Sequence, residues 1–258
     1  AQQVISELFK GSFDRERYLY FLRNFLNHFE PKENKYYKNA RLWDKFWPHI
    51  NYYERIGKYT DPDGTELDLL IVEVPNFTKL ERSRTALRNL VVKHLETFGD
   101  KSHALVAFYA KEDKGADWRF SYIKIEHTAK LDEKRGKVKL EKDLTPAKRF
   151  SFLVGEHENS HTACRQLLPV LEMDYADPKV EEIEAAFSIE KVTDEFFDQY
   201  KALFQKLAEH LKKQPWFKQA SDEETDQAVS RFAKKLLGQI VFLYFLQKKG
   251  WLGAAKGK

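Results

Sequence analysis

The feature that most constrains this chain is a strong turn signal followed directly by an uninterrupted apolar segment. Residues 61–64 read DPDG, in which proline presets one backbone angle and glycine accepts conformations that other residues avoid. Residues 67–74 then include four consecutive apolar side chains, a run typical of a strand that is covered on both faces. Pro75 ends the strand because proline cannot donate a hydrogen bond to a neighbouring strand. The sequence therefore predicts a strand buried inside the fold.

The segments around this strand predict a sheet with both antiparallel and parallel neighbours. Residues 52–60 have strand composition and run into the turn, so they should form a hairpin with residues 65–74. Apolar side chains at three- and four-residue spacing predict a helix over residues 80–94. Residues 104–110 are typical of a buried strand, and the strand-helix-strand order favours a parallel neighbour for residues 66–74. We therefore expect an α+β or α/β fold whose mixed sheet is flanked by helices.

The register of the hairpin decides which polar side chains share a face of the sheet. We place Thr60 opposite Thr65, at the end next to the turn. Side chains alternate along a strand, so Glu54 and Lys58 then share one face. Asp68 lies on the other face in this register.

The remaining segments in the first two thirds of the chain predict short helices and strands. Amphipathic spacing predicts an opening helix over residues 15–29, whereas residues 30–50 have only irregular or short helical character. The later segments are, in order, a strand over residues 118–127, an exposed Lys- and Glu-rich connection over 129–149, a strand over 150–154 and a helix over 162–171.

The composition changes near residues 174–178, which predicts a domain boundary. We place a first domain over residues 1–174 and a helical region over residues 179–258. Two long helical stripes, over residues 192–211 and 229–241, support this division. The second helix becomes apolar on all sides at its end, so that end must be covered by something, and a further domain is the best candidate.

The composition narrows the class of protein. The 258 residues are enough for one large domain or two smaller ones, and a net charge of +4 permits binding to nucleic acid without requiring it. A single cysteine, Cys164, excludes an internal disulfide and suits a reducing cytoplasm. The longest apolar run is far below the roughly 20 residues of a membrane-spanning helix. We therefore expect a soluble, cytoplasmic protein with no membrane segment.

Three acidic residues flank or lie on the central strand: Asp63, Asp68 and Glu73. Nucleases use clustered carboxylates because hard oxygen ligands hold Mg²⁺, which polarises a phosphate and activates water. The sequence thus offers catalytic roles for all three residues and a metal site at Asp68 and Glu73. The alternative is structural: Asp63 belongs to the turn, Asp68 pairs with Arg55, and Glu73 is an edge charge. Strand alternation supports this alternative, because Asp68 and Glu73 should point to opposite faces.

Basic residues follow the central strand and can contact the phosphates of a nucleic acid. Two basic edges are expected on the helix over residues 80–94, and a further arginine lies in the strand over residues 118–127. A solvated helix face without a binding role is the competing interpretation. The candidate DNA-binding residues are Lys79, Arg82, Arg84, Arg88, Lys93 and Arg119.

Residues 157–161 read HENSH, which formally matches the H-E-x-x-H zinc signature. That signature requires a helix, in which the two histidines lie one turn apart. Here the residues follow a strand and Gly155, and Asn159 and Ser160 are typical of helix starts. The sequence predicts a loop and a helix start, and a zinc peptidase is the less favoured alternative.

Several of these segments resemble the N-terminal region of type IIG-like single-chain restriction-modification enzymes, which fuse an endonuclease region to an adenine-specific DNA methyltransferase. The resemblance spans most of the chain from about residue 50 onward, and the last two segments are its most specific part. The segments are TDPDGTELDLLIVEVP, ERSRTALRNLVVKHL, ALVAFYA with DWRFSYIKIEH, FSFLVGEHENSHTA, IEAAFSIEKVTDEFFDQYKALFQKL and LLGQIVFLYFLQKKGWLG.

The resemblance implies a nuclease-like PD-(D/E)XK fold followed by a helical connector to the methyltransferase. This chain would be the front fragment, and S-adenosylmethionine would bind only in the absent methyltransferase part. In the PD-(D/E)XK pattern, an Asp on one strand and an E-x-K on the next bind Mg²⁺. Asp63 or Asp68 matches the Asp, and Glu73 begins the second element, but Pro75 stands where the pattern has lysine.

Two functions follow from the resemblance. In the first, the domain hydrolyses double-stranded DNA with Mg²⁺ as part of a type II restriction-modification system in phage defence, with Lys79, Arg84 or Arg88 in the place of the missing lysine. In the second, it is a catalytically inactive module that binds DNA or supports the methyltransferase. Pro75 and the alternation of the strand favour the second.

Overall fold

The structure is a computed structural model that describes residues 1–37, 41–99, 101–125, 129–132, 137–140, 147–173, 176–248 and 251–253. The chain divides into two compact units, Ala1–Phe187 and Ser188–Lys258. The sequence placed the boundary between residues 174 and 179, whereas helix α6 (Val180–Ala186) belongs to the first unit. Among the described residues, no helix combines the length and the apolar character needed to cross a membrane.

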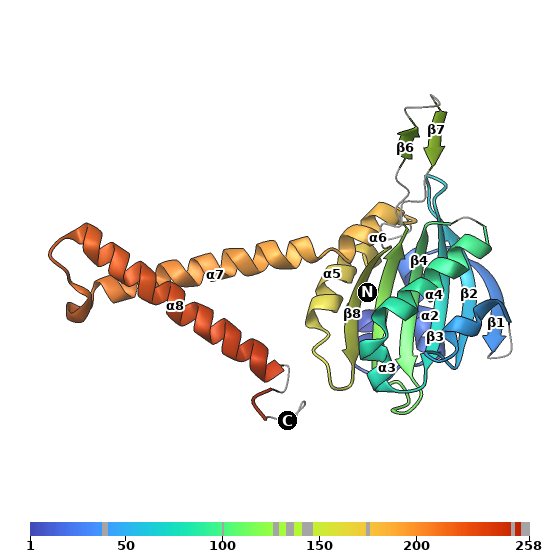
Figure 1. Cartoon of the computed structure of the whole chain (residues 1–258), viewed down its shortest axis with the longest axis horizontal. Helices are drawn as coiled ribbons and strands as arrows, with labels where there is room; N and C mark the ends of the chain where they lie inside the picture. The colour runs from blue at the N-terminus through green and yellow to red at the C-terminus, as the bar shows by residue number, and fades with distance from the viewer. Residues whose placement is uncertain are drawn as a thin grey trace. The chain divides into compact units, whose positions relative to one another are not determined.

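The first unit is built on a six-stranded open sheet in which β3 and β4 are the parallel pair and the other described neighbours are antiparallel (Figure 1). The hairpin and the parallel neighbour predicted from the sequence are both confirmed. The strands in spatial order are β1 (Glu30–Tyr37), β2 (Tyr52–Thr60), β3 (Glu66–Val74), β4 (His103–Ala110), β5 (Asp117–Lys124) and β8 (Lys148–Gly155).

Helices cover both faces of this sheet, which makes the unit a mixed α+β fold, as the sequence predicted (Figure 1). One face packs against α1 (Gln2–Phe9), α2 (Arg15–Leu26), α5 (His161–Leu171) and α6, and the other packs against η1 (Arg41–Phe46), α3 (Phe77–Arg82) and α4 (Arg84–Thr97). Side chains alternate along β3, so Leu69 and Ile71 enter the core under α2, whereas Leu70 and Val72 enter the core under α4. We call the second of these faces the α4 face.

The helix predicted over residues 80–94 is two helices, so the prediction of a single helix was wrong. Ser83 is the last cap of α3 and the first cap of α4, with a backbone conformation (φ −91°, ψ 26°) outside the helical region. The Ser83 hydroxyl makes no cap hydrogen bond and lies 3.1 Å from His49 Nδ1 instead. Leu80 and Leu87 still share one core, since each helix turns its apolar side toward the sheet.

The register of the β2–β3 hairpin differs from the prediction at the end next to the turn. Thr60 pairs with Glu66, and an irregularity between Arg55 and Gly57 absorbs the one-residue difference. Lys58 consequently lies opposite Asp68, on the face from which the prediction had excluded it. Glycine is required in this bulge, because a Cβ atom at position 57 would lie 2.8 Å from the backbone oxygen of Glu30.

Two segments contain strands that the sequence did not predict. Strand β1 lies within residues 30–50, where only irregular or short helical structure was expected. Strands β6 (Ala129–Asp132) and β7 (Lys137–Leu140) form a separate antiparallel pair within the segment predicted as an exposed connection. The rest of that connection up to residue 146 lies outside the described residues.

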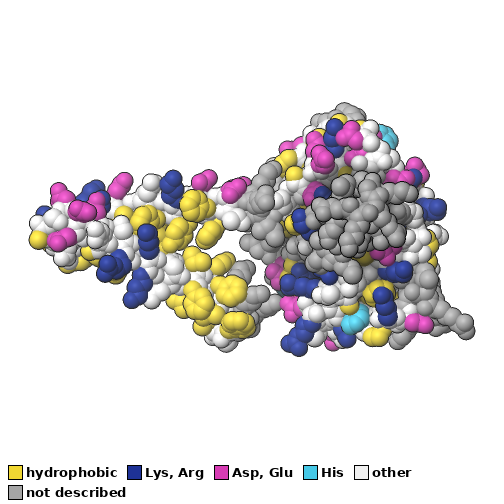
Figure 2. Space-filling model, turned by 45° about the horizontal axis from the view of Figure 1, so that its top comes forward, with side chains coloured by type: hydrophobic (Ala, Val, Ile, Leu, Met, Phe, Trp, Pro, Cys, Tyr) yellow, Lys and Arg dark blue, Asp and Glu magenta, His cyan; other side chains and the backbone are white. Residues whose placement is uncertain are grey.

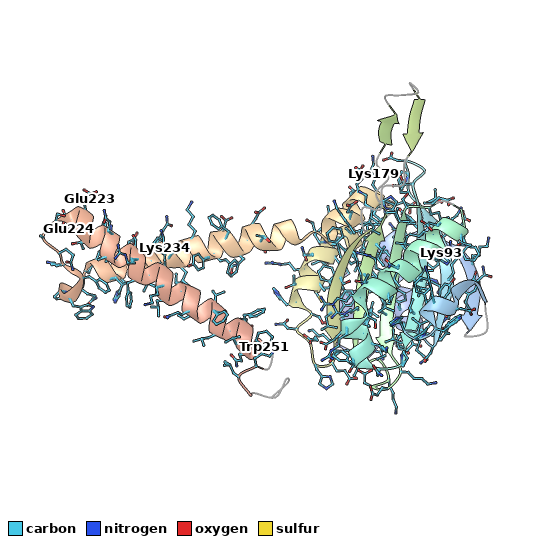
Figure 3. All side chains as sticks on the ribbon, viewed as in Figure 1. Lys93, Lys179, Glu223, Glu224, Lys234 and Trp251 are labelled. Atoms are coloured by element: carbon cyan, nitrogen blue, oxygen red, sulfur yellow. The ribbon has the colours of Figure 1, made fainter. Side chains whose placement is uncertain are left out.

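The second unit is a pair of long helices, α7 (Ile189–Lys212) and α8 (Asp222–Lys248), joined through the short η2 (Pro215–Phe217). The two predicted helical stripes are therefore confirmed. Their buried core is small and consists of Leu211, Val229 and Ala233 with partly buried neighbours. Figure 2 shows many hydrophobic side chains on the surface of this unit, and Trp251, labelled in Figure 3, is 71% exposed. The helix pair therefore leaves many large apolar side chains exposed, among them Phe242, Tyr244 and Trp251.

Candidate nucleic-acid interface

The three acidic residues of the predicted nuclease site do not converge. Asp68 lies on the α4 face of β3 and Glu73 on the opposite face, as alternation requires. Asp63 lies in the turn before the strand, where its carboxylate pairs with Lys179 Nζ at 3.0 Å. Within the described part of the chain, no group of three or more His, Cys, Asp or Glu side chains could hold a metal ion.

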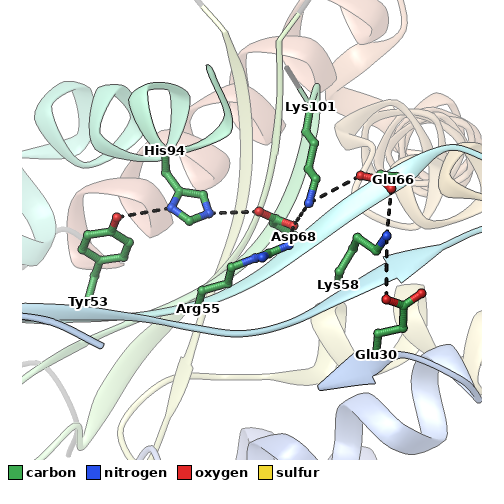
Figure 4. A network of polar contacts seen from close by, with 8 residues as sticks. All are labelled: Glu30, Tyr53, Arg55, Lys58, Glu66, Asp68, His94 and Lys101. Atoms are coloured by element: carbon green, nitrogen blue, oxygen red, sulfur yellow. Dashed lines mark hydrogen bonds and ion pairs between the residues drawn. The ribbon is translucent and has the colours of Figure 1, made fainter. Parts of the chain in front are cut away.

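Asp68 is the centre of a buried polar network (Figure 4). Its Oδ1 accepts hydrogen bonds from Arg55 Nη2 at 2.7 Å and from Lys101 Nζ at 2.6 Å. Its Oδ2 lies 2.9 Å from His94 Nε2. Burial acts to raise the pKa of Asp68, but the hydrogen bonds from His94, Lys101 and Arg55 outweigh it and lower that pKa to about 2. Asp68 is thus an ionised carboxylate surrounded by its own protein partners.

His94 extends this network to Tyr53. Both side chains are fully buried, and the Tyr53 hydroxyl lies 3.3 Å from His94 Nδ1. Burial is the main cause that lowers the pKa of His94, so the ring is neutral near pH 7. A neutral ring can donate from Nε2 to Asp68 and accept at Nδ1 from Tyr53, which satisfies both nitrogens. Because this relay is buried, it is suited to hold α4 against the sheet.

Glu73 is also held by hydrogen bonds. Its Oε1 accepts from Asn51 Nδ2 at 2.9 Å and its Oε2 accepts from the Tyr109 hydroxyl at 2.8 Å. Mg²⁺ needs carboxylate oxygens that meet at one point, with room for several waters. Asp68 and Glu73 do not provide this, since they lie on opposite faces and their oxygens already accept hydrogen bonds. The residues present do not fit the Mg²⁺ site that the resemblance implies.

The zinc signature lies at a loop and a helix start, as the sequence predicted. Helix α5 begins at His161, so His157 precedes it and the two histidines are not one helical turn apart. The His157 backbone nitrogen donates to Asp117, and the His161 backbone nitrogen donates to Asn159 Oδ1 at 3.0 Å. The helical context that a zinc peptidase needs is missing.

Four arginines come together on the α4 face, and we call them the arginine cluster: Arg84, Arg88, Arg119 and Arg149. The first two lie on α4, the third on β5 and the fourth on β8. Arg149 Nη1 donates to the backbone oxygen of Arg84 at 3.3 Å, and its guanidinium lies 4.5 Å from the centre of the Phe108 ring. Figure 2 shows several Lys and Arg side chains close together on the visible side of this unit.

The arginines of the cluster perturb one another. The pKa of Arg149 falls to about 9, first because the side chain is buried and then because Arg119, Arg84 and Arg88 are close. The pKa of Arg119 is also lowered, mainly by burial and next by Arg84. Across the described residues, none of the four guanidinium groups lies within ion-pair distance of a carboxylate. Within the described part of the chain, the cluster is therefore a concentration of positive charge without a close counter-ion.

The remaining predicted DNA-binding residues lie outside the cluster. Lys79 and Arg82 belong to the last turn of α3. Lys93 projects from α4 (Figure 3), and its Nζ lies 4.0 Å from Glu96. The sequence did not single out Arg149, because the segment that contains it was predicted to be a connection. The Lys148–Arg149 pair directly before an apolar strand is the signal that could have identified it.

Comparisons of the chain with models of protein families, with curated proteins and with solved structures found no match. The mixed sheet, the buried Asp68 network and the arginine cluster are therefore the observations from which a function can be inferred.

Proposed function

We propose that the first unit is a DNA-contacting module that binds the phosphate backbone of double-stranded DNA through the arginine cluster. The observation that carries this proposal is the convergence of Arg84, Arg88, Arg119 and Arg149 without a carboxylate in ion-pair distance among the described residues. Like charges held together destabilise a fold unless an anion neutralises them. The phosphates of DNA are such anions, and their neutralisation releases counter-ions and adds affinity.

Arginine is well suited to this role. Its planar guanidinium matches two oxygens of a phosphate, and the charge stays in place at every physiological pH. Arg84 is exposed and Arg88 is half-buried, so both can meet a backbone that approaches α4 from solvent. Arg119 is buried and Arg149 is half-buried, and both add positive potential next to them.

The place of this module in a larger protein is part of the proposal. An open mixed sheet with a parallel pair and helices on both faces supports a nuclease-like fold similar to PD-(D/E)XK, as in type IIG-like restriction-modification enzymes. The second unit would be the helical connector to an adenine-specific DNA methyltransferase, which would bind S-adenosylmethionine. The exposed apolar residues at the end of α8 support such a neighbour, and phage defence in the cytoplasm would be the setting.

The geometry favours binding over cleavage as the function of this unit. A nuclease site needs Asp68 and Glu73 at one metal ion, and the two side chains lie on opposite faces of the sheet. Pro75 in place of the lysine of the PD-(D/E)XK pattern agrees with this reading. The module would then place DNA for chemistry that another part of the protein performs.

The test is a binding titration with the 258-residue chain and a fluorescent DNA duplex, read by anisotropy. A double variant, Arg84→Gln with Arg88→Gln, should bind at least roughly tenfold more weakly. The matched control, Arg17→Gln with Arg23→Gln, removes the same charge from α2 on the opposite face and should bind like the parent chain. Equal losses of duplex affinity in both variants would mean that binding depends only on the net charge of the chain. No duplex binding by the parent chain at low salt would refute the proposal.

A further inference from the structure

Arg119 is a buried cation that has no hydrogen-bond or ion-pair partner among the described residues. The residue is only 7% exposed, and its Nε touches no solvent and has no hydrogen-bond acceptor. Arg55 is comparably buried at 5% exposure, but its Nη2 donates to Asp68. Burying a charge without a counter-ion is strongly unfavourable, and proteins normally avoid it. Among the described residues no carboxylate lies within ion-pair distance of Arg119, and Glu81 and Glu158 act on it only from farther away, so a ligand from outside is the natural counter-ion.

The polar side chains next to Arg119 on the sheet hold one another in place through hydrogen bonds, so they need no rearrangement before a ligand binds. Ser121 and Ser151 lie opposite one another on β5 and β8, with their hydroxyl oxygens 2.7 Å apart. Arg149 Nε donates to Ser151 at 3.0 Å and its Nη2 donates to Ser121 at 3.3 Å. Together with the bond to Arg84 and the contact with Phe108, these fix the guanidinium plane while using only part of its five N–H groups.

The charges near Arg119 define what can bind. The positive charge of Arg84 lowers the pKa of Arg119, and the charges of Arg119 and Arg149 are close enough to repel one another. The carboxylates of Glu81 and Glu158 act on Arg119 with the opposite sign, but from beyond ion-pair distance. A ligand must therefore bring its own negative charge and several oxygens that can accept from two guanidinium groups at once. A phosphate group has both properties, because its oxygens match the fork of an arginine.

We propose that Arg119 and Arg149, with Arg84 at the rim, form a discrete site for a single phosphate group. This inference rests on the proposed function, because it identifies the bound group as a phosphate of the DNA backbone. The same chemistry would accept the phosphate of a free nucleotide. Arg119 is the anchor, because it alone is both buried and without a hydrogen-bond acceptor among the four arginines of the cluster.

The site can be tested without DNA. Thermal unfolding of the 258-residue chain is measured in sodium phosphate and in sodium chloride at equal ionic strength. Phosphate should raise Tm in a saturable way that chloride does not reproduce. Arg119→Met removes the buried charge and keeps most of the volume, so its Tm without phosphate should exceed that of the parent chain while the phosphate-specific rise disappears. The control Arg23→Met, on exposed α2 surface, should keep the rise.

Several outcomes would overturn the site. One is a parent chain whose Tm responds equally to both salts, and another is an Arg119→Met chain that keeps the phosphate-specific rise. Arg149→Lys provides a second probe, because it keeps the charge and loses the planar fork. The rise should shrink in Arg149→Lys, and an unchanged rise counts against the site.

A competition experiment separates the two sources of phosphate and the two proposals. If inorganic phosphate displaces the duplex and Arg119→Met weakens duplex binding, the occupant is a backbone phosphate. If a nucleoside monophosphate raises Tm while Arg119→Met leaves duplex binding unchanged, the phosphate site exists but DNA does not supply the phosphate that occupies it. If the duplex binds through Arg84 and Arg88 but phosphate has no specific effect, the proposed function stands and the phosphate site fails.

Discussion

His94 Nε2 lies 2.9 Å from Asp68 Oδ2 in the interior of the first unit, which ties helix α4 to strand β3. Both side chains are fully buried. The carboxylate that the nuclease interpretation needs for a metal is thus used to hold the helix that carries Arg84 and Arg88. Its role in binding would be indirect, through the position of that helix.

Asp68→Asn should destabilise the first unit strongly. The substitution leaves the buried Arg55 without its counter-charge and leaves Lys101 with only Glu66, and removing one partner of a buried ion pair costs about 3–5 kcal/mol. Urea denaturation followed by circular dichroism measures the loss. Glu66→Gln is the matched control, since its partly exposed ion pairs with Lys58 and Lys101 should be worth about 1 kcal/mol or less. Similar losses for the two variants would contradict a central role for Asp68.

Acidification should destabilise the first unit in two stages. Burial lowers the pKa of His94 in the folded state, so the unfolded chain takes up the proton first and stability falls as the pH drops below about 6.5. The pKa of Asp68 is lowered to about 2, so its contribution is complete above about pH 4 and is lost as the pH falls from there toward 2. Tm measured from pH 8 to pH 2 tests both stages.

A substitution assigns the first stage. His94→Gln removes the titrating ring, so the decline of Tm just below about pH 6.5 should become shallower. His161→Gln, at an exposed position at the start of α5, should leave the profile unchanged. A profile that is the same in His94→Gln and in the parent chain would mean that His94 does not cause this stage.

Gly57→Ala should destabilise the β2–β3 hairpin. The added Cβ would lie 2.8 Å from the Glu30 oxygen and equally close to the Phe29 ring, so β1 would have to move. Overpacking of this kind costs about 1–3 kcal/mol. Gly64→Asn is the control, because its positive φ of 84° is tolerated by Asn and no atom lies within 4 Å of the added Cβ. Comparable Tm values for the two variants would mean that the bulge tolerates a side chain.

The sequence predicts the centre of the sheet well because local signals agree there. The DPDG turn, the apolar run of β3 and the stop at Pro75 lead to the observed hairpin, and the strand-helix-strand order leads to the parallel partner. Strand β1 has no such signal. Its sequence EPKENKYY is polar, and the strand exists because it pairs with the edge of β2.

The candidate site was only partly predictable for a similar reason. Alternation along β3 already indicated that Asp68 and Glu73 point to opposite faces, and the structure agrees. That Lys101 and His94 reach Asp68 depends on contacts between residues far apart in the chain. Three arginines of the cluster were among the predicted DNA-binding residues. The fourth, Arg149, joins them only through the pairing of β8 with β5.

Two basic residues of α4 should differ in their contribution to DNA binding, although the sequence treats them alike. Arg88 belongs to the cluster, and its nearest side-chain acceptor is the neutral amide of Asn89. Lys93 lies farther along the helix beside Glu96. Arg88→Gln should therefore remove a phosphate contact, and Lys93→Gln should not.

The salt dependence of duplex binding measures this difference. Each phosphate contact contributes about 0.9 to the slope of log K against log salt concentration. Arg88→Gln should reduce that slope by about one contact and weaken binding at low salt by roughly tenfold. Lys93→Gln, which removes the same charge from the same helix, should leave the slope within error of the parent chain. Equal changes in both variants would mean that DNA responds to the net charge of α4. A change in Lys93→Gln alone would move the interface away from the arginine cluster.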